Sequence, residues 1–169
     1  MADLQNSYPW MPADCLARRF EMLERRGDVV RAYRELVNEL RESMLADIRA
    51  ERKRSALIHF RTFADYCLRC LFVAYAASED ELDRKSSPKN LIGVAERVIT
   101  HWEMPVPPAA VKDLARLHAE LSQATHGTPG AVKKVEKWAP KWIPDIEKAC
   151  DLLVELVGEA DFRLNGHRG

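Results

Sequence analysis

The fold is decided by residues 114–127, which read Leu114-Ala115-Arg116-Leu117-His118-Ala119-Glu120-Leu121-Ser122-Gln123-Ala124-Thr125-His126-Gly127. Apolar side chains recur here every three or four residues, which is the spacing of one face of an α-helix. With Val111 before it, this apolar face comprises Leu114, Leu117, Leu121 and Ala124. Gly127 follows at a position where helices often end. The segment therefore predicts an amphipathic helix over residues 109–125.

Composition places this helix in a single all-α domain. A chain of 169 residues suits one domain, and about two-thirds of the unfolded surface can be buried at this size. Hydrophobic residues make up 47% and charged residues 31% of the chain, as in soluble globular proteins. The formal net charge is zero, because 26 basic residues balance 26 acidic ones. There is no overall basic field to attract nucleic acid, so any such binding needs a local patch.

Helix-type spacing continues outward from the opening segment along most of the chain. It predicts a single-domain bundle of five to seven mostly antiparallel helices over residues 12–166, after an irregular N-terminal arm over residues 1–11. Helices are expected over residues 55–77 and from Ser87, as the N-cap before Pro88, to about residue 102. The charged run over residues 49–54 contains neither glycine nor proline, so the helix before it either continues or bends there.

Glycine and proline predict two interruptions within this pattern. Gly27 is expected to end the first helix, and Asp28 is a good N-cap for the next. Pro140 is expected to break a short helix over residues 132–138, and Pro144 to begin the last helix.

Four cysteines are present, at positions 15, 67, 70 and 150. Cys67 and Cys70 form a C-x-x-C pair, but no second ligand pair completes a zinc site and no strand precedes it as in a thioredoxin-like site. We expect buried free thiols in a reducing cytoplasm, with no metal and no cofactor. The chain opens without signal-peptide features. The most apolar stretch carries Arg61, Asp65 and Arg69, which argues against a membrane span.

Polar side chains follow one line beside the apolar face of the opening helix. His118, Ser122 and His126 are four residues apart and so share a stripe. Such a stripe could bind an anion, hold a metal or serve acid–base chemistry, and Arg61 of the preceding apolar helix would line the same polar cleft. The two histidines lie about 12 Å apart along the axis, too far to share one metal. The alternative is that His118 sits at the core boundary and His126 closes the helix end.

A second polar patch reads Lys133-Lys134-Val135-Glu136-Lys137-Trp138-Ala139-Pro140-Lys141-Trp142. Lysines contact phosphates, and tryptophans stack on unpaired bases, so the mixture is typical of a nucleic-acid contact. The alternative is that Trp138 and Trp142 pack on the last helix while the lysines are solvated.

The segment Leu121-Ser122-Gln123-Ala124-Thr125-His126-Gly127, with Arg61 on the preceding apolar helix, resembles the HEPN superfamily of prokaryotic defence and toxin–antitoxin loci. The resemblance covers roughly residues 30–160. It implies a four-to-five-helix bundle that commonly forms homodimers. Many members are metal-independent RNases with an Arg-x4–6-His motif, in which the histidine acts as acid or base and the arginine stabilises phosphate charge.

The chain departs from that motif, because no arginine lies five to seven residues before His126. A formal match occurs at Arg54 and His59 instead. We therefore expect a module without a standard catalytic motif, acting as a binding or regulatory component of a nucleic-acid-related antiviral defence or toxin–antitoxin system. One alternative is a metal-independent RNase with a displaced active site. The other is a helical adaptor for a partner protein, with no nucleic-acid role.

Overall fold

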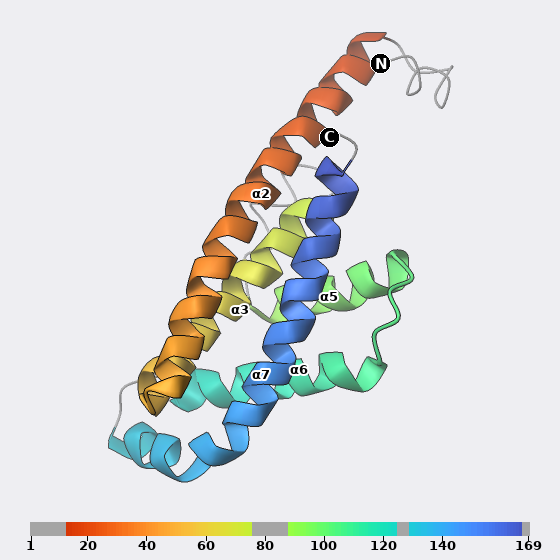
Figure 1. Cartoon of the computed structure of the whole chain (residues 1–169). Helices are drawn as coiled ribbons and strands as arrows, with labels where there is room; N and C mark the ends of the chain where they lie inside the picture. The colour runs from red at the N-terminus through yellow and green to blue at the C-terminus, as the bar shows by residue number, and fades with distance from the viewer. Residues whose placement is uncertain (1–12, 76–87, 125–128, 167–169) are drawn as a thin grey trace.

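The computed structural model describes residues 13–75, 88–124 and 129–166, which fold almost entirely as α-helix (Figure 1). The five helices of this part of the chain are α2 (Ala13–Arg49), α3 (Lys53–Tyr75), α5 (Pro88–His101), α6 (Pro108–Ala124) and α7 (Pro129–Asn165). No strand occurs among these residues, so the predicted all-α class and single helical domain are confirmed. The predicted arm over residues 1–11 and the N-cap Ser87 lie outside the described residues.

The central helix is α3, which packs against each of the other four. In Figure 1, α2 runs opposite to α3, and α7 runs alongside α3 in the same direction. The remaining pair, α5 and α6, run in opposite directions and cross the other three. The helices α2 and α3 are therefore antiparallel, and so are α5 and α6, as short connections between consecutive helices favour.

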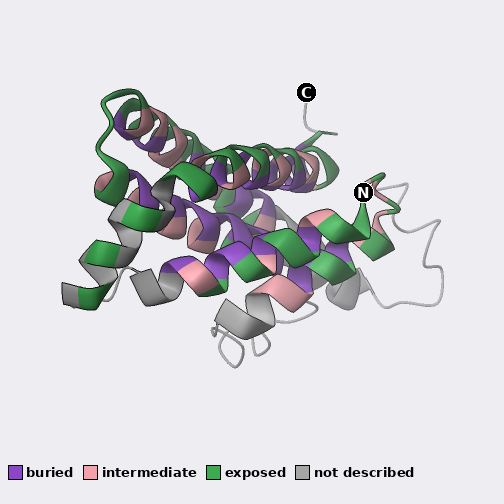
Figure 2. Ribbon diagram, turned by 90° about the horizontal axis from the view of Figure 1, so that it is seen from below, coloured by how far each residue is buried: buried purple, intermediate pink, exposed green. Residues whose placement is uncertain are grey.

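The core surrounds α3 because its apolar residues occupy more than one side of the helix. Ten of its 23 residues are buried, including the adjacent pairs Cys67-Leu68 and Leu71-Phe72. Adjacent positions point about 100° apart on a helix, so no single neighbour can cover both. Figure 2 shows the buried residues facing the interior of the bundle and the exposed ones facing outward.

The prediction that Gly27 ends a helix and Asp28 caps the next is wrong, because α2 continues through both. A helical glycine costs only about 1 kcal/mol relative to alanine. Packing outweighs this cost, since Val30, Val37 and Met44 recur every seven residues and are fully buried. Gly27 is itself buried, and its carbonyl accepts a hydrogen bond from the amide of Asn165 in α7 at 2.8 Å.

The prediction of a break before Pro140 and a new helix at Pro144 is also wrong, because α7 contains both prolines. Each proline lacks an amide donor and crowds the carbonyl four residues earlier, which bends a helix without always ending it. Figure 1 shows the first part of α7 turned away from the line of the rest. Trp142 and Ile146, both buried, hold the helix against the core across this region.

The charged run after α2 is a turn between helices. Glu51 adopts a left-handed conformation with φ of 55°. Its amide donates to the carbonyl of Ile48 at 3.1 Å, and the amide of Arg52 donates to that of Asp47 at 2.9 Å. This is the Schellman pattern that ends a helix, here with glutamate where glycine is usual. Glu103, with φ of 51°, ends α5 in the same way.

Candidate nucleic-acid interface

Four exposed lysines of α7 lie on the outside of the bundle. Lys133, Lys137 and Lys141 are exposed at four-residue intervals, and exposed Lys148 follows two turns later. Residues at these intervals share one side within each straight part of a helix, and Lys133 and Lys137 precede the bend at Pro140 and Pro144 while Lys148 follows it. We call these four residues the lysine ridge. The side chains of Lys134 and Trp138, also predicted to contact nucleic acid, are outside the described part of the structure.

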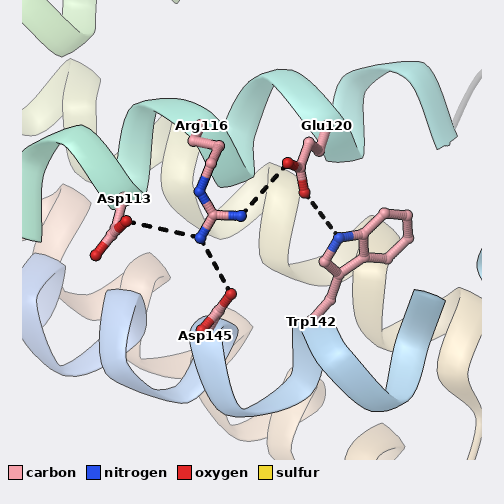
Figure 3. A network of polar contacts seen from close by, with 5 residues as sticks. All are labelled: Asp113, Arg116, Glu120, Trp142 and Asp145. Carbon is pink, nitrogen blue, oxygen red and sulfur yellow. Dashed lines mark hydrogen bonds and ion pairs between the residues drawn. The ribbon is translucent and has the colours of Figure 1, made fainter.

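Trp142 fixes the orientation of the lysine ridge. Its side chain is only 4% exposed, on the opposite side of α7 from the lysines. The indole N–H donates to Oε2 of Glu120 in α6 at 2.9 Å (Figure 3). Because the buried ring sets the rotation of α7 about its axis, the lysines must face solvent. The ring itself lies in the core, so the interface proposed below does not include it.

Arg116 extends this connection between α6 and α7. Its guanidinium lies 3.4 Å from Glu120 and 3.6 Å from Asp113 on its own helix, and 3.3 Å from Asp145 across the gap (Figure 3). Hydrogen bonding to Asp145 holds the pKa of the guanidinium above its ordinary value. The ion pair of Arg116 and Glu120 could be predicted from the sequence, because opposite charges four residues apart meet on one side of a helix. The contact with Asp145, 29 residues away, needed the tertiary structure.

The structure describes only part of the predicted polar stripe of His118, Ser122 and His126. His118 is 6% exposed, and its Nε2 lies 3.1 Å from Oδ1 of Asp65 on α3. Half-buried Arg61 lies one turn before Asp65. The side chain of Ser122 and all of His126 lie outside the described part. The arrangement is a polar link between α3 and α6, in which a carboxylate positions a buried imidazole.

The alternative pair at Arg54 and His59 lies at the start of α3. Five residues of helix turn the chain through about 500°, so exposed Arg54 points to a different side from His59. His59 Nδ1 instead lies 2.8 Å from Oδ2 of Asp47, at the end of α2. The arginine next to this pair is Arg52, whose Nε donates to Oδ1 of Asp47 at 2.7 Å. Arg52 and Asp47 could not be predicted as part of a site from the sequence, because the α2–α3 turn brings them together.

Asp47 is held as a carboxylate at this corner. It is 4% exposed, and its pKa lies below its ordinary value, first because Ser55 donates a hydrogen bond and then because Arg52 does. The imidazole of His59, whose side chain is 37% exposed, lies beside this carboxylate.

The cysteines behave as the sequence predicted wherever they are described. Cys67, Cys70 and Cys150 are free and buried. Burial raises the pKa of the Cys70 thiol to about 12 and that of Cys67 well above its ordinary value. Such thiols are unreactive at neutral pH, because the thiolate is the nucleophile. The side chain of Cys15 is not described.

The described residues contain no group of three or more His, Cys, Asp or Glu side chains arranged to hold a metal ion. No helix within residues 13–75, 88–124 and 129–166 has the length and apolar character needed to cross a membrane.

Compared with known proteins, the chain matches no family model, no curated protein and no solved structure.

Proposed function

We propose that this protein is a HEPN-like helical module that binds RNA through the lysine ridge and lacks a standard catalytic motif. The observation that carries the proposal is the exposure of Lys133, Lys137, Lys141 and Lys148 on α7. The net charge of the chain is zero, so RNA binding needs a local basic group such as this one. The protein would act in the cytoplasm as a homodimer, and it would belong to a defence or toxin–antitoxin system.

The buried Trp142 supports the ridge as a backbone-binding surface. Lysines attract phosphates without regard to sequence, whereas base recognition needs aromatic or hydrogen-bonding groups at the surface. With the Trp142 ring in the core, the described ridge offers charge alone. The expected behaviour is salt-sensitive binding to single-stranded RNA.

Charge reversal tests this proposal. The variant Lys133→Glu/Lys137→Glu is expected to weaken binding of a labelled single-stranded RNA about tenfold or more, because two phosphate contacts become repulsive. Fluorescence anisotropy measures the affinity, and circular dichroism checks the fold. The control is Arg31→Glu/Arg97→Glu, which makes the same change in charge at exposed positions of α2 and α5. Equal affinities for the two variants would remove the ridge from the interface.

A second candidate function, metal-independent RNA cleavage, rests on the 2.8 Å contact between His59 and Asp47. Histidine would take a proton from a ribose 2′-hydroxyl, whose oxygen attacks the adjacent phosphorus while the 5′-oxygen leaves and is protonated. Arg52, beside Asp47, would attract the phosphate.

Incubation with labelled RNA in EDTA tests the cleavage directly. Wild type is compared with His59→Ala and His126→Ala, with exposed His101→Ala as the matched control. Cleavage lost only in His59→Ala supports a site at the α2–α3 corner. Cleavage lost only in His126→Ala assigns the acid–base role to His126 instead. Intact RNA with the wild type rejects the enzyme and leaves RNA binding to be judged by the ridge variants.

A further inference from the structure

A cavity of about 140 Å³ lies between α6 and α7, next to the Arg116 contacts of Figure 3. Its floor is apolar, formed by Leu114, Ala149 and Leu152. Leu114 and Ala149 are buried, so the floor belongs to the packed core. Two carboxylates, Asp113 and Asp145, also line the cavity. An apolar floor with a few polar groups is the usual composition of a small-molecule or base pocket.

The cavity adjoins the lysine ridge. Lys148 lines it and is also the last residue of the ridge. Lys141 lies two helical turns before it, about 10 Å along the axis. An RNA strand whose phosphates follow the ridge would therefore pass the mouth of the cavity. A nucleotide unstacked at that point could turn its base inward, which is how proteins usually read single-stranded RNA.

Arg116 contacts both carboxylates that line the cavity, and so it affects which of their oxygen atoms can accept a hydrogen bond from a base. The same guanidinium nitrogen lies 3.6 Å from Oδ1 of Asp113 and 3.3 Å from Oδ2 of Asp145. It therefore pairs with carboxylates from both helices that line the cavity. A carboxylate has about four acceptor sites, so each group keeps capacity for a further donor. The cavity thus offers hydrogen-bond acceptors above an apolar floor.

We propose that this cavity is a base-binding subsite that accepts one unstacked cytosine, an inference that rests on RNA binding at the lysine ridge. The exocyclic amine of cytosine donates to carboxylates, whereas uracil has a carbonyl acceptor at the same position. The size agrees with a pyrimidine, because a cavity of about 150 Å³ holds a six-membered ring such as benzene. The floor residues contact the face of the ring, and Lys148 contacts a neighbouring phosphate.

The test compares two RNAs of equal length and charge, a twelve-residue oligouridylate and the same strand with one central cytosine. We expect the cytosine strand to bind about tenfold more tightly, the discrimination typical of a correctly paired base contact. Ala110→Phe, which fills the cavity from α6, is expected to remove the preference and leave oligouridylate affinity unchanged. Asp113→Asn, at a mostly exposed position, is expected to reduce the preference without affecting the fold.

The outcomes separate the two proposals. Equal affinity for both strands, unchanged in both variants, would overturn the subsite while leaving the ridge in place. No affinity for either strand would overturn the ridge and the subsite together. A preference that survives both Ala110→Phe and Asp113→Asn in folded protein would place cytosine recognition elsewhere and reject this cavity.

Discussion

Trp142 was predicted to contact nucleic acid, and its substitution distinguishes that role from a structural one. The ring is 4% exposed and donates to Glu120 at 2.9 Å. Removing a buried tryptophan ring costs about 3–5 kcal/mol. For a chain of this size, each kcal/mol lowers the Tm by about 2–4 °C. Trp142→Ala is therefore expected to lower the Tm by about 6–20 °C.

The milder variant Trp142→Phe makes RNA binding measurable in folded protein. It loses the indole hydrogen bond and part of the ring, which costs about 1–2 kcal/mol, or about 2–8 °C in Tm. Its affinity for single-stranded RNA is expected to stay within about twofold of wild type, because the ring is in the core. Trp102→Phe, a half-buried tryptophan stacked under Arg163, is the matched control.

Thermal unfolding by circular dichroism and RNA binding by anisotropy are measured on the same samples. The reasoning would be refuted if Trp142→Phe kept the wild-type Tm and lost RNA affinity about tenfold. That result would mean that the ring leaves the core to stack on a base, as tryptophans at single-stranded sites do.

Three further predictions concern the fold. Glu51→Gly should raise the Tm by about 2–4 °C in a melting experiment, because glycine relieves about 1 kcal/mol of left-handed strain; an unchanged or lower Tm would contradict the cap. In a Cys15→Ser variant, a thiol reagent at pH 8 should label no cysteine until denaturant is added. The reason is that the three remaining thiols are buried and burial raises the pKa of Cys70 to about 12. Rapid labelling of the native protein would contradict the burial of these thiols. The folded pKa of Asp47 lies below its ordinary 3.8, so its stabilisation is present above that value and is lost as the pH falls through the lower folded value. The Tm difference between wild type and Asp47→Asn should therefore shrink below about pH 4, and a difference independent of pH would argue against a charged Asp47.

Helix positions could be predicted from the sequence where one apolar face repeats, as it does from Leu114 to Leu121. Helix ends could not, because local signals compete with packing. Gly27 lies in a helix whose buried face continues past it at Val30. Pro144 lies between two residues, Trp142 and Ile146, that anchor α7 to the core.

In the candidate site, too, the surface positions could be predicted from the sequence and the tertiary contacts could not. Lys133, Lys137 and Lys141 were predicted to belong to one basic patch, and all three are exposed. The partners of buried groups were not predictable. Trp142 meets Glu120 across 22 residues, and His59 meets Asp47 only because of the turn at Glu51.

The most direct test of the lysine ridge is the salt dependence of RNA affinity, measured by anisotropy between 50 and 200 mM NaCl. Four phosphate contacts on a single strand predict a slope of log K against log [salt] of about −3, or about a fifty-fold loss over this range. Lys133→Glu/Lys137→Glu should reduce the magnitude of the slope by about half. A slope near zero, or one that the double variant leaves unchanged, would contradict RNA binding at the lysine ridge.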